Sequence, residues 1–289
     1  LSDVDLKSYT DTAYHNEELK SLTRYRFDKV RERAKLKQSV SRLVTILFPE
    51  LEKLVPSLHI ASVYALLSEY PGAKQISEIH LTKLTNLLAT ASKGRYGKDK
   101  AIQIRDAART SIGSVMPAKF LELKHTIKLI RELTSEIDEI EVSIQKIMDE
   151  LNPPILSIPG VGIQSAAMIL AEIGDIKRFS NANKLAQFAG IAPLHLSSSG
   201  KGKDVATKQG NRRLQATIYF LAIQMVQVSS KGTPRNSVVR AYYEKRKAEG
   251  KTSQQALICI SRRLISIIYG MLKNGTEYRM PVVESAGEK

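Results

Sequence analysis

The amino-acid sequence predicts an all-α protein, and two observations support this fold class. Apolar residues recur at every third or fourth position through several segments, most clearly over residues 118–150, and this spacing places them on one face of a helix. No segment alternates convincingly between apolar and polar residues, so we expect no β-strand. The chain has 289 residues, enough for a sizeable core, and we expect two domains, 1–151 and 152–289.

The first long helix is expected over residues 16–51, with Asn16 as its cap. A basic face lies between its apolar positions, and this face fits either a solvated helix surface or a helix that lies along a nucleic-acid backbone. Prolines and glycines then break the pattern, and shorter helices are expected over residues 58–70, 76–92 and 99–113. The basic residues of the first helix are Arg24, Arg26, Lys29, Arg31, Arg33, Lys35 and Lys37.

Residues 118–150 are expected to form a long amphipathic helix of coiled-coil type. Its outer positions are rich in acids, which would repel nucleic acid, so this helix is expected to pack on protein. Its partner is either the helix over residues 16–51 or a second copy of the chain. Asn152-Pro153-Pro154 ends the helix and marks the domain boundary. The apolar positions are Leu123, Ile127, Ile130, Leu133, Ile137, Ile140, Ile144 and Ile147.

A tight turn at Pro159-Gly160-Val161-Gly162 is expected to join two helices. Pro159 stops the first helix, and the two glycines can adopt backbone angles that are closed to other residues. Such a helix-hairpin-helix-like turn leaves free N–H groups at the start of the second helix, where a phosphate can dock without any reading of sequence. The same residues also fit a helix–helix connection that binds no ligand.

A polar loop follows, with three consecutive serines among glycines and basic residues. A serine hydroxyl attacks phosphorus only with help from a base, a metal or strong local positive charge, and this loop offers hydroxyls beside cations, which suits a phosphodiester. By composition alone the segment also fits a flexible solvated linker. The residues concerned are Ser197, Ser198, Ser199, Lys201, Lys203, Lys208, Arg212 and Arg213.

Three further helices are expected over residues 214–228, 236–249 and 253–272. The first and last are apolar and belong to the core, whereas the middle one interleaves basic side chains with tyrosines, as nucleic-acid contacts often do. The single cysteine, Cys259, lies in an apolar run and is expected to be a buried structural thiol. A lone cysteine cannot form an internal disulfide, which fits a reducing cytoplasm.

The charge of the chain points to a polyanionic partner. Lysine and arginine number 44 against 29 acidic residues, and the net charge is +15, which favours nucleic acid through counterion release. We see no apolar run of 18 residues for a membrane span and no secretory signal. The scattered histidines and the one cysteine form no metal-ligand pattern.

Several motifs in a fixed order resemble one protein family. They are Pro159-Gly160-Val161-Gly162, Phe188-Ala189-Gly190-Ile191-Ala192-Pro193, the serine loop, and Lys208-Gln209-Gly210-Asn211-Arg212-Arg213-Leu214. Together they resemble the C-terminal domain of bacterial insertion-sequence transposases that pair a RuvC-like nuclease domain with a serine-bearing domain and are guided by a structured bridge RNA. The resemblance covers roughly residues 15–279, and the ordered set is more specific than any one motif.

The resemblance implies DNA transposition by site-specific recombination, in which a serine attacks DNA phosphodiesters. Counting from Pro193 indicates Ser198 as the nucleophile, adjacency to Gly200 indicates Ser199, and Ser197 ranks third. Lys208, Asn211 and Arg212 match the closing motif and are expected to hold DNA or the loop. The implied partners are DNA, a bridge RNA and further copies of the chain in a dimer or tetramer. The implied location is the bacterial cytoplasm, in association with the nucleoid.

One departure from the family pattern concerns magnesium. The family carries acidic metal-binding residues on a RuvC-like domain that precedes this region, and Asp3, Asp5 and Asp11 do not match that motif. We therefore expect Mg²⁺ only through that domain, with none bound by this chain, and interpret the sequence as an N-terminally truncated copy or fragment. The alternative is a non-catalytic nucleic-acid-binding remnant of a transposase. A membrane-surface or scaffold protein is a third, weaker interpretation.

Overall fold

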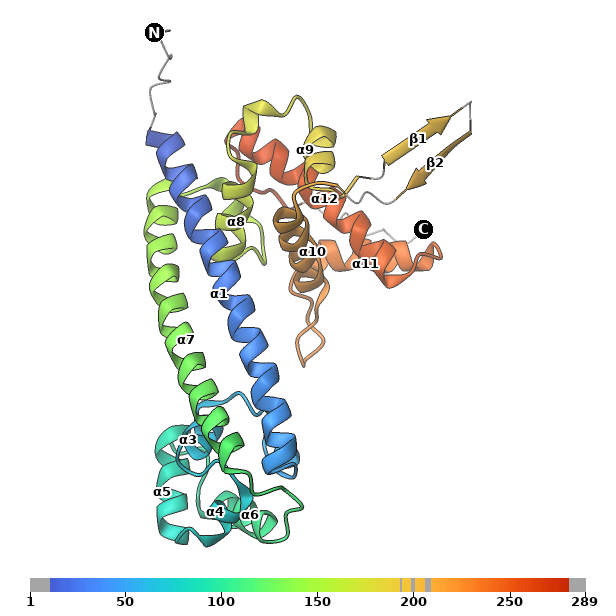
Figure 1. The fold of residues 1–289 in the computed structure, drawn as a ribbon. Helices are drawn as coiled ribbons and strands as arrows, with labels where there is room; N and C mark the ends of the chain where they lie inside the picture. The colour runs from blue at the N-terminus through green and yellow to red at the C-terminus, as the bar shows by residue number, and fades with distance from the viewer. Residues whose placement is uncertain (1–10, 193, 199–200, 206–208, 281–289) are drawn as a thin grey trace. The chain divides into compact units, whose positions relative to one another are not determined.

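The computed structural model describes residues 11–192, 194–198, 201–205 and 209–280 of the chain. Helices dominate it, which confirms the all-α prediction (Figure 1). The elements are α1 (Asp11–Leu47), α2 (Leu51–Leu54), α3 (Ala61–Glu69), α4 (Ala73–Glu78), α5 (Leu81–Ser92), α6 (Lys98–Arg109), α7 (Pro117–Leu151), η1 (Pro154–Ser157), α8 (Ile163–Ile173), η2 (Ile176–Arg178), α9 (Ala182–Phe188), β1 (Leu194–Ser198), β2 (Lys201–Val205), α10 (Arg212–Val226), α11 (Ser237–Ala248) and α12 (Ser253–Asn274).

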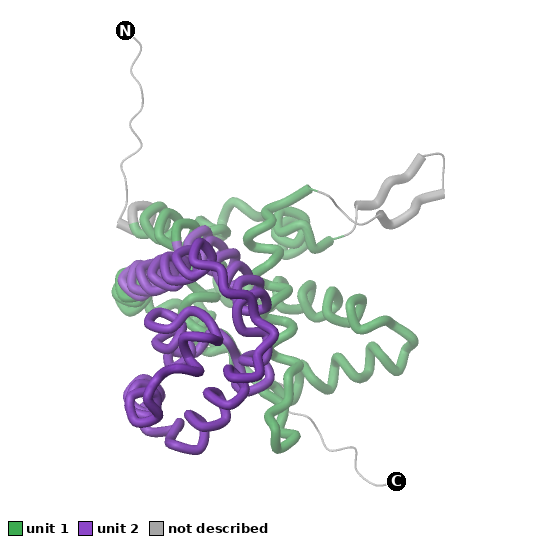
Figure 2. Tube along the Cα trace, turned by 60° about the horizontal axis from the view of Figure 1, so that its bottom comes forward, with its two compact units in different colours: residues 1–25, 141–289 green, residues 26–140 purple. Residues whose placement is uncertain are grey.

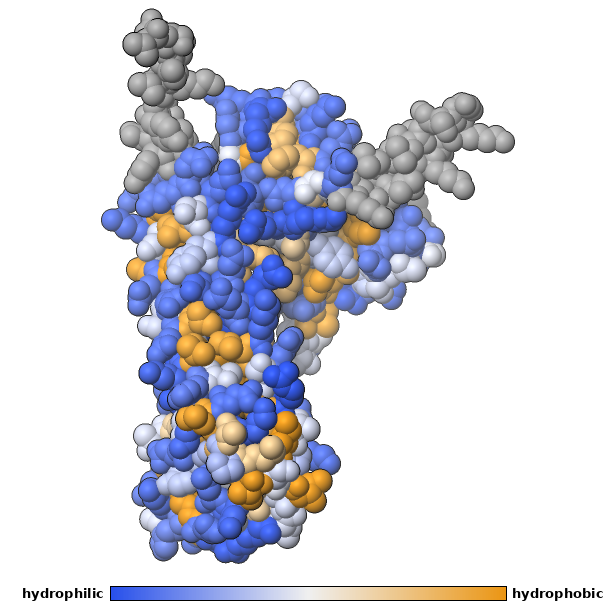
Figure 3. Space-filling view, in the orientation of Figure 1, coloured by the Kyte–Doolittle hydropathy of each residue, from blue (hydrophilic) through white to orange (hydrophobic). Residues whose placement is uncertain are grey.

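The chain divides into two compact units, which Figure 2 colours separately. Unit 1 comprises residues 1–25 and 141–289, and unit 2 comprises residues 26–140. Each of the two long helices, α1 and α7, therefore contributes one part to each unit. On the face drawn in Figure 3, hydrophilic side chains predominate and apolar ones form separate groups, as expected when most apolar surface is buried within the units.

Unit 2 has its own apolar core, built around the fully buried Phe48 with leucines and isoleucines of α1 and α3 to α7. Within this unit the acidic helix α7 lies against the basic helix α1. Lys29 Nζ is 3.0 Å from Glu136 Oε2, and Arg33 Nη1 donates to Thr134 Oγ1 at 3.2 Å. An ion pair thus joins the two helices. The sequence left open whether the acidic helix packs on the basic helix or on a second copy of the chain, and the structure shows the first of these pairings within unit 2. Coiled-coil geometry and contacts between copies stay predictions.

Several predicted boundaries are wrong in unit 2 and at the start of unit 1. Helix α1 begins at Asp11, so Asn16 lies inside the helix and does not cap it. The helix expected over residues 76–92 is two helices, α4 and α5, because Ile79 and His80 adopt extended backbone angles between them. The apolar spacing continues across this break, since both helices turn an apolar face to the same core, and periodicity alone does not reveal it.

Unit 1 is organised around α8, which is buried over most of its length. Helix α10 packs on both α8 and α12, and α9 packs on α12. Helix α12 is long and apolar enough to cross a membrane by length and composition, a property also found in buried core helices. This finding differs from the expectation that the chain has no apolar run of that length. Buried residues at helical spacing along α12, from Ala256 to Met271, face the neighbouring helices, which favours a core helix.

The polar serine segment is a β-hairpin, which corrects the expectation that the chain contains no strand. Strands β1 and β2 pair antiparallel, with Leu194 opposite Val205 and Ser198 opposite Lys201. Only Leu194 and Leu196 supply an alternating apolar pattern in β1, and β2 reads Lys-Gly-Lys-Asp-Val. Two apolar positions are too few to identify a strand by period, whereas backbone pairing needs no particular side chain.

The turn before α8 departs from a full helix-hairpin-helix. The first helix of the expected pair is the single 3₁₀ turn η1, which ends at Ser157 before Pro159. Gly160 has a φ of +95°, a region that favours glycine, and Val161 N–H donates to the Ile158 carbonyl at 3.0 Å. Gly162 then precedes the first turn of α8. The glycine turn exists as expected, and phosphate docking at it stays a prediction.

Candidate functional site

Two glycines in close contact, Gly190 and Gly210, flank the hairpin and join it to the rest of unit 1. A Cβ atom on Gly210 would lie 2.7 Å from both the N and Cα atoms of Gly190, and a Cβ on Gly190 would lie 2.7 Å from the Gln209 carbonyl. Both glycines have positive φ, +116° for Gly210 and +67° for Gly190. No other residue type fits this close approach without a backbone shift. The two chain segments that enter and leave the hairpin are therefore held together.

Hydrogen bonds reinforce this junction from both sides. The Asn211 N–H donates to the Phe188 carbonyl at 2.7 Å. The Gln215 side-chain amide, one turn into α10, donates to the Gly190 carbonyl at 2.7 Å. Asn211 also caps α10, because its Oδ1 accepts from the N–H groups of Arg213 at 3.1 Å and Leu214 at 3.0 Å. The start of α10 and the root of the hairpin thus form one hydrogen-bonded structure.

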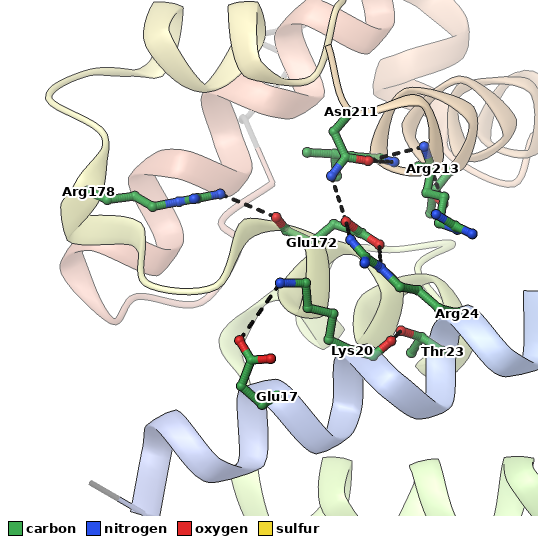
Figure 4. A network of polar contacts seen from close by, with 10 residues as sticks. Glu17, Lys20, Thr23, Arg24, Glu172, Arg178, Asn211 and Arg213 are labelled. Carbon is green, nitrogen blue, oxygen red and sulfur yellow. Dashed lines mark hydrogen bonds and ion pairs between the residues drawn. The ribbon is translucent and has the colours of Figure 1, made fainter. Parts of the chain in front are cut away.

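A buried carboxylate ties this structure to α1 and α8 (Figure 4). The Glu172 side chain is 1% exposed and lies near the end of α8. Arg24 binds it through two parallel hydrogen bonds, Nε to Oε1 at 2.8 Å and Nη2 to Oε2 at 2.9 Å. Asn211 Nδ2 donates to Oε2 at 2.6 Å. Because Asn211 uses its other side-chain atom to cap α10, Glu172 fixes the position of the cap.

The pKa of Glu172 reflects a competition between burial and its partners. Burial favours the neutral acid and would raise the pKa of this carboxyl. The hydrogen bonds from Arg24 and Asn211 and the charges of Arg24 and Arg213 outweigh burial and hold the pKa below its ordinary value. The same pairing raises the pKa of Arg24. Glu172 is therefore a carboxylate at neutral pH, and a permanent acceptor for Asn211.

Arg178 supports the same region from the opposite side of Glu172. Its guanidinium lies 4.6 Å from the ring centroid of Phe179 and 4.5 Å from that of Phe188, distances at which cation–π attraction operates. Its Nη2 donates to the main-chain carbonyl of Glu172 at 3.4 Å. The main-chain carbonyl of Phe188 accepts the hydrogen bond from Asn211 N–H. The contact between Arg178 and the Phe188 ring therefore helps to hold in place the residue to which the hairpin root is bound.

The structure brings together some of the predicted site residues and leaves others apart or undescribed. Asn211 and Arg213 belong to the Glu172 network, and Arg212 is exposed at the first turn of α10. By backbone position, Ser198 ends β1 opposite Lys201, and Lys203 pairs with Leu196. Ser199 and Lys208 lie outside the described residues. Gly160 and Gly162 belong to the separate turn before α8.

Four residues of this arrangement were not singled out as site residues from the sequence: Arg24, Glu172, Gly190 and Gly210. Glu172 carries a signal, because it is the one charged residue in the mostly apolar helix IQSAAMILAEI, and a buried charge requires a partner. Arg24 lies 148 positions away along the chain, and no local pattern connects the two. The glycines were noted only as parts of motifs.

Replacing Gly210 by alanine is expected to destabilise unit 1 by about 3 kcal/mol, as the sum of backbone strain and a forced shift. Gly232 offers a matched control: its φ is +78°, and a Cβ there would meet nothing within 4 Å. Gly232→Ala should therefore cost only about 1 kcal/mol. Chemical denaturation of both variants measures the difference. Equal losses would show that the contact with Gly190 is unimportant.

Comparisons with known proteins agree on one kind of relative. Residues 152–244 match the model of a family described as Transposase IS116/IS110/IS902 family. The chain is 29% identical to the insertion element IS110 43.6 kDa protein of Streptomyces coelicolor, over 91% of this chain and 65% of the relative. It is 26% identical to the insertion element IS900 42 kDa protein of Mycobacterium paratuberculosis, over 93% of this chain and 67% of the relative.

A further relative is named for a different activity. The pilin gene-inverting protein of Moraxella bovis is 27% identical over 74% of this chain and 65% of its own length. The chain spans about two thirds of the length of the relatives described here. The segment that matches the family model, residues 152–244, includes the hairpin, its glycine junction and Glu172.

Proposed function

We propose that this chain acts in DNA transposition by site-specific recombination, and that a serine of the hairpin attacks DNA phosphodiesters. One observation carries the proposal: the transposase-family match over residues 152–244 contains a serine-bearing hairpin whose root is fixed by the glycine contact and the Glu172 network. A rigid root is what a nucleophile on a projecting element needs, because small displacements of a reacting group are costly to rate.

The chemistry is an exchange of phosphate esters. The serine Oγ forms a bond to a backbone phosphorus, and the bond from that phosphorus to a deoxyribose oxygen breaks. The serine proton leaves to a base, and the released deoxyribose oxygen takes up a proton. The phosphoserine ester conserves the energy of the broken bond, so a second DNA hydroxyl can displace the serine without an external energy source. The register sets the Ser198 position across from Lys201, and cations favour the charge that develops on the phosphoryl oxygens.

No step is assigned to a metal ion. Within the part of the chain that the structure describes, no three His, Cys, Asp or Glu side chains gather closely enough to hold one. Supply of Mg²⁺ by a RuvC-like domain stays an expectation from the resemblance. Guidance by a structured RNA, assembly into a dimer or tetramer, and a cytoplasmic, nucleoid-associated location belong to the proposal on the same ground.

Covalent capture of DNA tests the proposal directly. The protein as expressed from its own gene is mixed with labelled DNA that spans the junctions of its element and with RNA transcribed from that element. We expect a denaturant-resistant protein–DNA adduct, and peptide mapping should place the phosphoester within Ser197–Ser199. DNA binding without any adduct would favour the non-catalytic, nucleic-acid-binding alternative. An adduct on another residue would remove the serine assignment and keep the recombinase.

A further inference from the structure

A groove of about 790 Å³ opens beside the root of the hairpin in unit 1. Three parts of the chain line it: the link between α9 and β1, the first two turns of α10, and the start of α12 with Lys251, two residues before that helix. Its lining residues are Gly190, Ile191, Ala192, Arg212, Gln215, Ala216, Tyr219, Lys251, Gln254, Gln255, Ile258, Cys259, Ser261 and Arg262.

The lining of the groove carries positive charge only. Arg212, Lys251 and Arg262 are cationic, and no lining residue is acidic. Glu249, close to Lys251 in sequence, is engaged with Arg246 Nη1 at 2.7 Å. Helices α10 and α12 both begin at the groove, so their dipoles add to the positive potential that the three side chains create.

The neutral part of the lining suits a polymer with polar and apolar parts. Gln254 offers an amide group, and Tyr219 offers a phenol. Ile258 is 41% exposed at the groove, an apolar contact for the carbon face of a sugar. The single thiol, Cys259, is half-buried in the lining, which corrects the expectation of a fully buried cysteine.

The position of the groove along the chain relates it to the serines. Ala192 lines the groove, and Ser198 follows it by six residues. Six residues span at most about 21 Å when fully extended. A B-DNA strand carries one phosphate per roughly 3.4 Å, so a groove-bound phosphate and a phosphate at the Ser198 position would lie within about six nucleotides of each other.

We infer that this groove binds the phosphodiester backbone of the DNA duplex on which the hairpin acts, with Lys251 and Arg262 as phosphate ligands beside Arg212. The inference rests on the proposed function and adds to it a specific binding surface. Backbone contacts of this kind carry no sequence information. The groove therefore holds the duplex in register with the hairpin, and sequence selection is left to other parts of the complex.

The test is the salt dependence of binding to a 30-base-pair duplex of arbitrary sequence, measured on the whole protein and on the double variant Lys251→Gln/Arg262→Gln. Each lost phosphate contact should reduce the slope of log K against log salt by about 0.9, and two lost contacts should weaken binding about 30-fold at 0.15 M salt. A structured RNA of similar size is measured in parallel.

The charge-matched control is Lys74→Gln/Lys231→Gln, which removes the same charge from exposed positions outside the groove. It should change DNA affinity by less than about threefold, since neither lysine lines the groove and solvent screens exposed charges. Because Arg262 is exposed and Lys251 half-exposed, both double variants should keep the melting temperature within about 2 °C.

The outcomes separate the groove from the proposed function. A reduced slope for DNA supports the groove. An unchanged slope with tight DNA binding overturns the groove and leaves the recombinase proposal standing. A reduction for RNA alone overturns the assignment to DNA. If the unaltered protein shows no salt-dependent binding of DNA at all, both the groove and the proposed function fail.

Discussion

Replacing Ser198 and Ser199 together by alanine is expected to reduce DNA strand exchange at least about a thousandfold, because removal of a nucleophile eliminates the covalent step. RNA binding should stay unchanged. The hairpin is joined to unit 1 through its glycine root, so the change should not disturb the core. Quantitative amplification of the recombined junction measures exchange, and a filter assay measures RNA binding. Exchange that survives in the double variant would show that the serine assignment is wrong.

A second serine pair supplies the control for this variant. Ser229 and Ser230 lie in the turn between α10 and α11 and are exposed. Ser229→Ala/Ser230→Ala likewise removes two serine hydroxyls, but from positions outside the hairpin. The rate of strand exchange should stay within about twofold of that of the unaltered protein, since surface substitutions rarely perturb the fold by more than ~0.5 kcal/mol. The single variants Ser198→Ala and Ser199→Ala then decide between the two candidate nucleophiles, because only one of them should match the double variant.

The parts of the fold that the sequence predicts well are those with a long, regular apolar pattern. The expected helix over residues 118–150 is α7, Pro117–Leu151, because its apolar positions recur without interruption. The apolar segments after the hairpin are likewise the helices α10 and α12 within two residues at each end. Here local sequence and burial agree, and the helix is determined by its own residues.

The errors arise where backbone contacts or distant residues decide the structure. The hairpin was missed because its pairing depends on main-chain groups and on the closeness of Gly190 and Gly210, 20 positions apart in sequence. The break between α4 and α5 was missed because apolar residues continue through it. Neither feature has a periodic signal within a single window of sequence.

The candidate site shows the same limit. Asn211 was expected to hold the loop or DNA, and in the structure it caps α10 and binds Glu172. That role follows only once α1, α8 and the hairpin root are known to meet. The buried acid Glu172 indicates from the sequence that it has a partner. The identity of that partner, Arg24, follows only from the folded structure.

Replacing Glu172 by alanine is expected to lower the free energy of unfolding of unit 1 by about 3 kcal/mol, near the low end for breaking a buried ion pair. The low end applies because the Arg24 side chain is 41% exposed and can regain water, whereas the Glu172 side chain is 1% exposed. At roughly 2–4 °C per kcal/mol, the melting temperature should fall by roughly 6–12 °C. Calorimetry of both proteins measures the loss.

Two comparisons separate the network from a general effect of substitution. Glu132→Ala removes an acid from the exposed pair with Lys128, whose side chains are 52% and 75% exposed, and should cost at most about 0.5 kcal/mol. Glu172→Gln keeps the volume and one acceptor for Asn211, and loses the charge that binds Arg24, so its cost should be intermediate. If Glu172→Ala were no more harmful than Glu132→Ala, the network would be structurally dispensable.

Acid should reproduce the effect of the substitution in the unaltered protein. The partners of Glu172 hold its folded pKa below the ordinary value of 4.5. The unfolded state therefore binds its proton at higher pH than the folded state, and the stability that Glu172 contributes is complete above about pH 4.5 and is lost as the pH falls through the lowered folded pKa. The difference in stability between the unaltered protein and Glu172→Gln should therefore shrink as the pH falls from 4.5 to 3.

Because Asn211 joins Glu172 to the hairpin root, the Gln variant should also lose part of its strand exchange near neutral pH while keeping its RNA affinity. A stability difference that is the same at pH 7 and pH 3 would show that the carboxylate charge of Glu172 does not contribute to the stability of unit 1, and unchanged strand exchange would show that this charge is not needed at the hairpin root.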